Sequence, residues 1–278
     1  MRIAVCGAAG QLGAAVARLF ADRGEVIPFT RAQLDIADAD AVRRAMDDAR
    51  PDVIVNCAAY NDVDGAEEDA AAALSANAIG VLALARAAKG REATIVHYGT
   101  DFVFDGTLDR PYTEEDEPKP QSVYAASKLL GEWFAAGAPS HYVLRVESLF
   151  GGPRRRSTVD RIADAIREGK PARVFVDRTV SPSYVEDVAS ATDRLLARRA
   201  PCGVYHCVNS GGTTWHELAK KIAELLDRPA ELIPVRVADV ELRARRPQYA
   251  ALSNRKLRDA GIDMPSWEDA LRRYLTQR

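Results

Sequence analysis

A tyrosine and a lysine four residues apart, Tyr124 and Lys128, are the side chains of this sequence with the clearest capacity for chemistry. Four residues make about one helical turn, so the phenol and the ammonium would project from the same face of a helix. A neighbouring cation favours the phenolate, which lowers the tyrosine pKa from about 10 toward the range useful for proton donation. The spacing predicts general acid catalysis by Tyr124. The alternative is a helix in which the tyrosine packs and the lysine is solvated.

Three glycines, Gly7, Gly10 and Gly13, follow an apolar segment at residues 1–6 and precede a helical pattern at residues 14–22. Such glycines let a strand turn sharply into a helix and let the backbone approach a pyrophosphate, whose charge binds the free N–H groups of the helix N-terminus. The spacing is GxxGxxG rather than the GxGxxG of the general dinucleotide motif. The pattern predicts dinucleotide binding, and the alternative is close strand–helix packing alone.

Thr30 and Arg31 come directly after residues 25–29, which have the composition of a second strand. In a dinucleotide-binding sheet, the adenosine ribose binds at the end of this strand. An acidic side chain there binds two ribose hydroxyls, whereas a hydroxyl and a guanidinium suit a 2′-phosphate. The pair favours NADPH as the cofactor, with NADH possible, unless Arg31 is an ordinary surface arginine.

Strand and helix patterns alternate up to about residue 149, with further buried strands at residues 52–59 and 94–101. This alternation predicts an α/β fold, a Rossmann-like doubly wound parallel sheet with a smaller C-terminal substrate-binding lobe. We expect residues 1–145 plus roughly 172–208 to form the dinucleotide-binding domain. Roughly 146–171 and 209–278 would then form the lobe. After residue 153 we expect helices at 159–168, 185–198 and 215–226 and a short strand at 173–176.

The composition excludes several classes of protein. With 278 residues and 47% hydrophobic content the chain can bury a large core, and a formal net charge of −2 gives no general attraction to nucleic acid. We expect no membrane span, since no apolar run approaches about 20 residues, and no secretory signal, which together predict a cytoplasmic location. Cys202, His206 and Cys207 are close in sequence, but 206 and 207 fall in a strand and would face opposite sides, so we expect no metal site.

Several motifs together resemble the extended short-chain dehydrogenase/reductases, and specifically the dTDP-4-dehydrorhamnose reductase family of sugar-nucleotide 4-ketoreductases. The resemblance covers nearly the whole chain. Its motifs are the glycine run, the segments 56–60, 99–106 and 111–114, the pair Tyr124 and Lys128, and Arg246-Pro247.

The resemblance implies reduction of the 4-keto group of a nucleoside-diphospho-sugar, with a hydride from the nicotinamide and a proton from Tyr124. Thr100 would polarise the carbonyl, and Lys128 would bind the nicotinamide ribose while lowering the tyrosine pKa. We therefore predict as catalytic residues Thr100, Tyr124 and Lys128, and as substrate-binding residues Thr100, Asp101, Tyr124, Ser148 and Arg246.

The same resemblance implies a set of cofactor-binding residues distributed over the first half of the chain. Asn77 matches an asparagine that we interpret as organising the helix that faces the catalytic residues. The predicted cofactor-binding residues are Gly7, Gly10, Gln11, Leu12, Thr30, Arg31, Asp35, Ile36, Ala58, Ala59, Tyr60, Asn77 and Lys128.

The chain departs from the family pattern at two places near the predicted catalytic residues. Gly99 stands where members usually carry Ser, and Arg145-Val146-Glu147-Ser148 replaces an R-T-S-W segment. The missing tryptophan stacks near the sugar in the family. Glu147 and Ser148 therefore put the rhamnose precursor itself in doubt and make a related keto, amino or deoxy sugar nucleotide plausible.

Two other functions fit the same motifs. A sugar-nucleotide epimerase or dehydratase of the same superfamily would use Tyr124 and Lys128 and keep NAD bound through each turnover. A non-catalytic NADP-binding regulatory subunit would not need Thr100, Tyr124 and Lys128 intact, as they are here. The expected partners are a small-molecule nucleotide sugar and a second copy of the chain in a homodimer.

Overall fold

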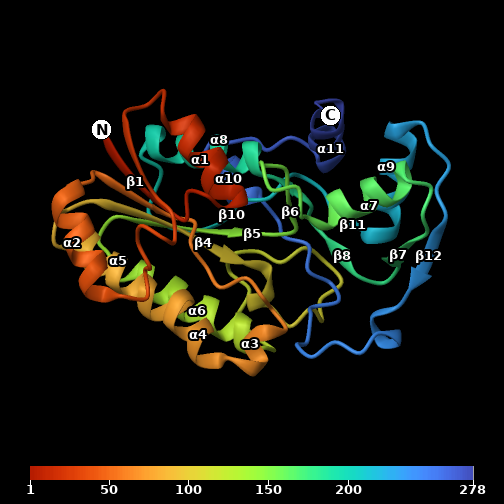
Figure 1. Cartoon of the computed structure of the whole chain (residues 1–278), viewed down its shortest axis with the longest axis horizontal. Coiled ribbons are helices and arrows are strands. Elements are labelled where there is room, and N and C mark those ends of the chain that lie inside the picture. The colour runs from red at the N-terminus through yellow and green to blue at the C-terminus, as the bar shows by residue number, and fades with distance from the viewer. Residues whose placement is uncertain (278) are drawn as a thin grey trace.

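The computed structural model describes residues 1–277, and its centre is a six-stranded sheet in which every strand pairing is parallel (Figure 1). This confirms the predicted α/β fold. In spatial order the strands are β2 (Glu25–Phe29), β1 (Arg2–Cys6), β3 (Val53–Asn56), β4 (Thr94–Thr100), β5 (His141–Val146) and β10 (Gly203–His206).

The strand order reverses direction at β1, because the chain first adds β2 on one side and then β3 on the other. At such a switch point the two connections leave in opposite directions and open a crevice at the carboxyl ends of the strands. The register places Cys6 beside both Phe29 and Asn56, so the segments that follow these residues emerge at the same level. Gly7, Thr30 and Cys57 therefore begin at one edge of the sheet.

Helices cover both faces of the sheet (Figure 1). On one face α1 (Gln11–Phe20) packs against α8 (Val185–Arg198), and on the other α5 (Gly80–Lys89) packs between α2 (Ala39–Ala49) and α6 (Val123–Ala136). The remaining helices and strands are short or lie in the C-terminal part. They are α3 (Gly65–Glu68), α4 (Ala70–Leu74), η1 (Ser75–Ile79), η2 (Asp101–Val103), β6 (Leu149–Phe150), α7 (Thr158–Arg167), β7 (Ala172–Phe175), β8 (Thr179–Val180), β9 (Ser183–Tyr184), β11 (Thr213–Thr214), α9 (Trp215–Leu226), β12 (Leu232–Val235), η3 (Val237–Asp239), α10 (Arg255–Asp259) and α11 (Trp267–Thr276).

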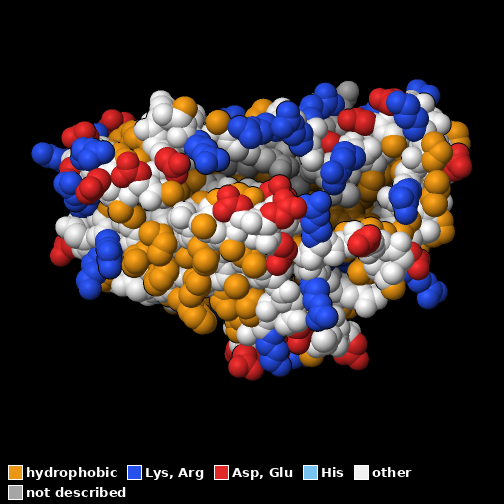
Figure 2. Space-filling model, turned by 60° about the horizontal axis from the view of Figure 1, so that its bottom comes forward, with side chains coloured by type: hydrophobic (Ala, Val, Ile, Leu, Met, Phe, Trp, Pro, Cys, Tyr) orange, Lys and Arg blue, Asp and Glu red, His pale blue; other side chains and the backbone are white. Residues whose placement is uncertain are grey.

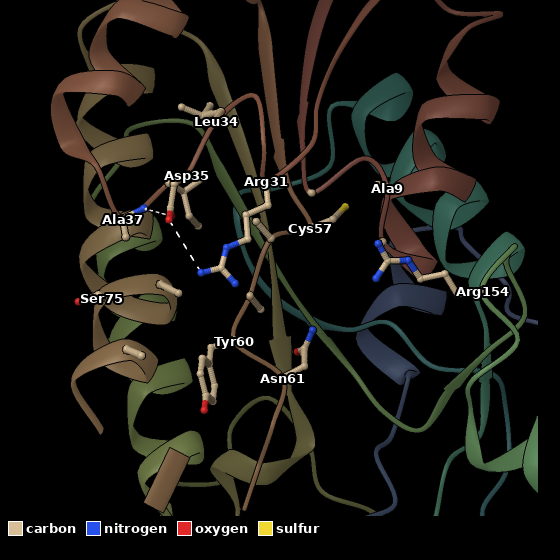
Figure 3. A pocket seen from close by; sticks show the side chains of 17 residues that line it. Ala9, Arg31, Leu34, Asp35, Ala37, Cys57, Tyr60, Asn61, Ser75 and Arg154 are labelled. Carbon is tan, nitrogen blue, oxygen red and sulfur yellow. Dashed lines mark hydrogen bonds and ion pairs between the residues drawn. The ribbon is translucent and has the colours of Figure 1, made fainter. Parts of the chain in front are cut away.

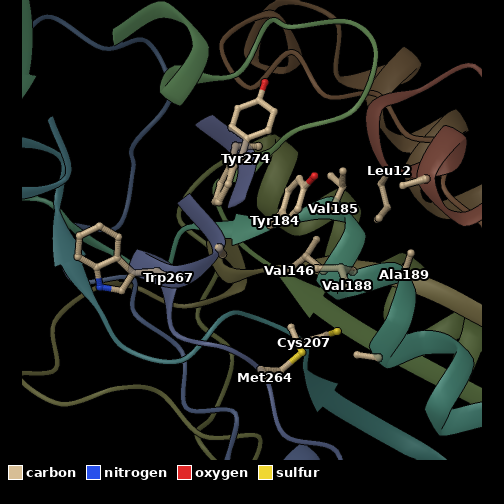
Figure 4. Close-up of a cluster of buried hydrophobic side chains, with 14 of the residues drawn as sticks. Leu12, Val146, Tyr184, Val185, Val188, Ala189, Cys207, Met264, Trp267 and Tyr274 are labelled. Atoms are coloured by element: carbon tan, nitrogen blue, oxygen red, sulfur yellow. The ribbon is translucent and has the colours of Figure 1, made fainter. Parts of the chain in front are cut away.

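The core divides along the pleat of the sheet. Ile3 and Val5 of β1 belong to the larger apolar cluster, under α1 and α8, whereas Ala4 and Cys6 belong to the cluster under α2 and α5. This alternation follows from the two-residue period of a strand. The larger cluster extends from Leu12 through Val188 to Tyr274 of α11 (Figure 4), so the C-terminal helix shares a core with the sheet.

The C-terminal part contains a small second unit in which β7 pairs in parallel with β12 and α7 packs against α9. We had assigned residues 172–208 to the dinucleotide-binding domain. Within that range α8 and β10 do belong to the main layers, but β7 lies outside the six-stranded sheet. We propose that the domain boundary follows β7 rather than precedes it.

The continuous helical segment Ala70–Lys89 is apolar and long enough to cross a membrane by length and composition alone, although we expected no such run. In its most apolar window 44% of the segment is buried within the protein. Its last part, α5, packs between α2 and α6. The α5 part of this segment therefore belongs to the packed core, whereas Leu74 and Ile79 are exposed.

A buried ion pair explains why the chain carries glycine at position 99. The guanidinium of Arg145, on β5, donates from Nη2 to Oε2 of Glu132, on α6, at 2.8 Å, and both side chains are buried. A β-carbon at position 99 of β4 would overlap Oε1 of Glu132. Gly99, which departs from the family pattern, therefore leaves the space that the carboxylate occupies.

We predict that Gly99→Ala lowers the free energy of unfolding by about 1–3 kcal/mol, the usual cost of overpacking a dense interior. The matched control is Gly90→Ala, because a β-carbon there meets only atoms at ordinary contact distance, 3.5 Å or more. Urea unfolding of both variants checks this. A Gly99→Ala variant as stable as Gly90→Ala would mean that the Glu132 carboxylate can move aside without loss of stability.

Candidate active site

Two adjoining clefts run along the carboxyl edge of the sheet. The first has a volume of about 430 Å³ and lies over the ends of β1, β2 and β3, and the second, of about 360 Å³, lies over β3, β4 and β5. Gly10, Cys57, Ala58, Ala59 and Asn61 line both. The clefts are therefore halves of one groove, which has room for an elongated ligand.

The glycine turn between β1 and α1 forms the floor where the halves meet. Gly7 has a φ of +75°, and a β-carbon there would lie 2.7 Å from the amide nitrogen of Ala58, so only glycine fits. Gly10 is the N-cap of α1 and supplies no side-chain cap, which leaves the first N–H groups of the helix open to a ligand. The predicted pyrophosphate site thus has the donors that it needs, and Gln11 and Leu12 line the second cleft beside it.

Two arginines lie at the first cleft, one on each side (Figure 3). The Arg31 side chain is 90% exposed, and its only ion pair among residues 1–277 is a long one to Asp35, at 4.0 Å. Arg154 approaches from the loop after β6. The two guanidiniums make this end of the groove suitable for an anionic group.

The other residues predicted for this end divide into two groups. Asp35 and Ile36 line the first cleft, as do Ala58, Ala59 and Tyr60. Thr30 and Asn77 are not among its lining residues. The Thr30 hydroxyl donates to Oε1 of Gln33 at 2.9 Å and so stabilises the turn after β2.

Asn77 lies behind the groove and holds its wall. Its Oδ1 accepts from the amide of Tyr60 at 2.8 Å, and its Nδ2 donates to the Tyr60 carbonyl at 3.1 Å and to Oγ of Ser127, on α6, at 3.0 Å. The buried amide is fully engaged by the protein. These contacts fit the predicted organising role, and the buried Asn77 side chain lines neither cleft.

The three predicted catalytic side chains, Thr100, Tyr124 and Lys128, all line the second cleft. Thr100 ends β4, while Tyr124 and Lys128 lie one turn apart on α6, whose N-terminus is capped by the Ser122 hydroxyl. The Phe102 ring packs edge-on against Tyr124 at 5.6 Å between centroids. The fold therefore brings together residues that are 24 to 28 positions apart in sequence.

The Thr100 hydroxyl is committed to a neighbouring carboxylate. Its Oγ1 donates to Oδ1 of Asp101 at 3.1 Å and accepts from the amide of Phe102 at 3.3 Å. Donation to a substrate carbonyl, the predicted role of Thr100, requires this bond to Asp101 to break. Asp101 therefore controls whether the Thr100 proton is free.

The electrostatics of Tyr124 and Lys128 differ from the prediction. Burial and the charge of Asp101 raise the pKa of Tyr124, opposed by a hydrogen bond with Thr100, and Lys128 does not contribute. The Lys128 ammonium instead donates to the carbonyl oxygen of Tyr98 at 2.6 Å. Burial lowers the pKa of Lys128 to about 8, so its charge is labile near neutral pH.

A charged cluster that sequence reasoning missed borders the catalytic residues. Arg178 is buried beneath the cleft, with its guanidinium 5.5 Å from the centre of the Phe102 ring and its Nε donating to the Pro247 carbonyl at 3.3 Å. The charges of Asp101 and Glu147 act on it and raise its pKa against the larger lowering effect of burial. A lone arginine between two short strands gives no sequence signal for such a position.

The predicted substrate residues Ser148 and Arg246 lie in different places. Ser148 lines the second cleft in a left-handed conformation with a φ of 44°, unusual for a residue other than glycine. Arg246 lines a separate cleft of about 520 Å³ in the C-terminal part, with Phe175, Arg178 and Trp215. Arg178 therefore lies between this cleft and the catalytic residues.

Arg246 also joins the C-terminal part to the sheet domain. Its Nη1 and Nη2 donate to the two carboxylate oxygens of Asp64 at 3.0 and 2.7 Å. This fork lowers the pKa of Asp64 to about 2. A ligand in the cleft would share Arg246 with Asp64.

The three residues considered for a metal do not form a site. The ring Nδ1 of His206 lies 3.1 Å from the Tyr112 carbonyl, Cys207 is buried, and Cys202 is exposed. Within residues 1–277 no group of three or more His, Cys, Asp or Glu side chains is arranged to hold a metal ion.

Known proteins are similar to this chain in sequence and in fold along its whole length. Residues 1–278 match the family model of the RmlD substrate binding domain. A dTDP-4-dehydrorhamnose reductase of Burkholderia thailandensis is 35% identical over 288 residues, which cover 98% of this chain and 97% of the relative. A probable dTDP-4,6-dihydroxy-2-methyloxan-3-one 4-ketoreductase of Streptomyces antibioticus is 36% identical over 280 residues, which cover 98% of this chain and 94% of the relative.

Solved structures agree with the sequence relatives. The crystal structure of a dTDP-4-dehydrorhamnose reductase from Bacillus anthracis str. Ames in complex with NADP has a TM-score of 0.95 at 32% identity, and the match covers 100% of this chain and 99% of that one. The family model, the relatives and the structure name the same kind of enzyme. This chain belongs to the RmlD family, the family of the dTDP-4-dehydrorhamnose reductases.

Proposed function

We propose that this protein is an oxidoreductase that uses NADPH to reduce the 4-keto group of a nucleoside-diphospho-sugar. The observation that carries the proposal is one groove in which the glycine turn, Arg31 and the catalytic residues Thr100, Tyr124 and Lys128 follow one another along the sheet edge. A relative of the same fold is bound to NADP. The relatives are named as reductases of dTDP-linked keto sugars.

The nicotinamide, when bound, supplies the hydride. The chain's own side chains supply the proton, the hydrogen bonds to the carbonyl oxygen and the contact with the nicotinamide ribose. Tyr124 donates its phenolic proton to the carbonyl oxygen of the sugar, so that negative charge never accumulates on that oxygen. Thr100, once released from Asp101, can donate a second hydrogen bond there. Lys128, whose ammonium is now held by Tyr98, would bind the nicotinamide ribose and place its charge nearer Tyr124.

The raised pKa of Tyr124 keeps the phenol protonated but makes it a weaker acid, so proton donation needs a partner that stabilises the phenolate. A phenol that holds its proton throughout the neutral range is present in the acid form when hydride arrives. Lys128 then serves to stabilise the phenolate that forms, and Phe102 and the surrounding wall exclude water. The order of events makes Tyr124 an acid in the reductive direction rather than a base.

The two other functions remain distinguishable from reduction. An epimerase or dehydratase returns the nucleotide to its starting state after each turnover, and a regulatory subunit does not change it. A reductase consumes one NADPH for each sugar reduced. Measuring the loss of NADPH absorbance with a panel of keto-sugar nucleotides tests the proposal, and a product formed without net NADPH loss would contradict it.

The cleft beside Arg246 suits the nucleoside diphosphate. Phe175 and Trp215 supply apolar surface for a base, and Arg246 supplies positive charge for the diphosphate. We propose that the substrate lies with its diphosphate at this cleft and its sugar near Tyr124.

NADH as an alternative cofactor, a cytoplasmic location and a homodimer stay predictions. Figure 2 shows hydrophobic side chains gathered over α4, α5 and α6, where Leu74, Ile79 and Trp133 are exposed.

We predict that Tyr124→Phe lowers kcat by about 10²–10⁴, because it keeps the ring but removes the transferable proton. The dissociation constant of NADPH should stay within about twofold. The control is Tyr205→Phe, which removes a hydroxyl that bonds to the Pro201 carbonyl away from the groove. Steady-state kinetics measure both. More than about a tenth of wild-type turnover in Tyr124→Phe would show that another group is the acid.

We predict that Arg31→Ala weakens NADPH binding about tenfold or more and leaves NADH binding nearly unchanged, because a charge-assisted bond to a phosphate is worth about 1.5–3 kcal/mol. The control is Arg43→Ala, an exposed arginine of α2 that pairs with Asp40. Fluorescence titration at low salt measures both cofactors. Equal affinity of the wild type for NADPH and NADH would refute a 2′-phosphate site.

We predict that Arg246→Ala raises KM for the sugar nucleotide about tenfold or more, a loss of about 1.4 kcal/mol, without changing the Kd of NADPH. The pairing with Asp64 calls for a second variant, Asp64→Asn, which removes the ion pair but keeps the arginine. Its KM should stay near that of the wild type. An equal rise in both variants would mean that the pair joins the two parts of the chain and that Arg246 does not bind phosphate.

A further inference from the structure

Two buried carboxylate oxygens at the catalytic residues have no hydrogen-bond donor. Within residues 1–277 no donor reaches Oδ2 of Asp101 or Oε1 of Glu147, and neither atom is accessible to solvent. The other oxygens are satisfied, since Oδ1 of Asp101 accepts from Thr100 at 3.1 Å and Oε2 of Glu147 accepts from the amide of Ser181 at 2.7 Å. Buried polar atoms without partners are rare enough to require an explanation.

The charge of this cluster is also unbalanced. Asp101, Glu147 and Arg178 are 3%, 2% and 9% exposed, so all three are withdrawn from water. Two ionised carboxylates and one guanidinium would leave a net negative charge in the interior, which is costly. One proton on the carboxylates would make the cluster neutral. The same proton, placed between the two free oxygens, would give each of them a partner.

We propose that Asp101 and Glu147 share one proton between their free oxygens, and that Glu147 acts through Asp101 as a positioning residue for Thr100 and Tyr124. The proposal rests on the proposed function in assigning catalysis to Tyr124. Glu147 stands where the family pattern has Ser. The family pattern therefore does not itself imply a proton shared at this position. The shared proton is thus a property of this chain's own side chains.

Burial raises the pKa of both carboxyl groups, and Arg178 opposes the rise at each of them. Burial and the charge of Asp101 raise the pKa of Glu147 well above its ordinary value, and burial raises that of Asp101 to about 6, opposed by Arg178 and the bond from Thr100. The other ionisable groups that face the cluster are Tyr124 on α6 and Tyr249, with Arg246 behind Arg178. Arg178 is therefore the cation that balances the pair.

The connection to catalysis runs through one hydrogen bond. Asp101 holds the Thr100 hydroxyl through Oδ1, and its charge raises the pKa of Tyr124. A proton shared with Glu147 withdraws charge from Asp101 and fixes the plane of its carboxyl group. Thr100 is then held less tightly and can turn to the substrate, while Tyr124 becomes a stronger acid.

Infrared difference spectroscopy of the wild type minus Glu147→Gln at pH 7, without substrate, tests the proton directly. We expect a band from a protonated carboxyl group that moves in D₂O, and we expect Asp101→Asn to change the frequency of that band. A difference spectrum that lacks a protonated-carboxyl band of the wild type, and holds only bands of ionised carboxylates, would overturn the proposal. A band that Asp101→Asn leaves at the same frequency would do so too, because Glu147 would then hold the proton alone.

Kinetics test the positioning role. Glu147→Leu fills the space without a hydrogen bond and should lower kcat about tenfold or more, with KM changed by less than about twofold. Glu147→Gln donates an amide N–H to Asp101 in place of the proton and should recover most of that loss. Equal kcat in the two variants would overturn the role, and Glu147→Met replaces Glu147→Leu if that variant does not fold. Failure to reduce any keto-sugar nucleotide would refute the proposed function alone, because the infrared measurement needs no turnover.

Discussion

The parallel direction of all strands in the central sheet is the constraint on which the site depends. Parallel strands end at one edge, and the reversal of order at β1 opens that edge into a groove. A residue that ends a strand or directly follows one therefore lies at the groove. The glycine turn follows β1, Arg31 follows β2, and Thr100 ends β4, so residues spread over the first hundred positions meet without any long connection.

Buried charge is the second organising feature, and it accounts for both departures from the family pattern. Gly99 makes room for Glu132, which neutralises the buried Arg145. Glu147 lies with Asp101 and Arg178 beside the catalytic residues, where charges must balance because water is excluded. In each case the residue that departs from the family pattern lies beside a charged side chain of another element. Both positions line the second cleft, beside the catalytic residues and away from the Arg31 end of the groove.

Sequence patterns predicted the bounds of helices and strands well where a single segment carried a strong hydrophobic pattern of its own. Helices were expected at 185–198 and 215–226, and α8 and α9 have these bounds. Short continuous apolar runs predicted the strands of the sheet, since a strand buried on both faces must be apolar along its length. The assignment of β7 was less accurate. A four-residue strand carries too little pattern to show which sheet it joins.

The sequence by itself determined the types and the spacing of the reactive groups, because the turn from strand to helix and the single helical turn between Tyr124 and Lys128 are local geometry. Only the tertiary structure decided their electrostatic state. The Lys128 ammonium binds the Tyr98 carbonyl, and the pKa of Tyr124 responds to burial and to Asp101, because desolvation and Coulomb forces depend on distance in space and not on separation along the chain. The tertiary structure also decided that Arg154 and Arg178 line the clefts. Folding brings them there from loops whose sequence carries no periodic signal.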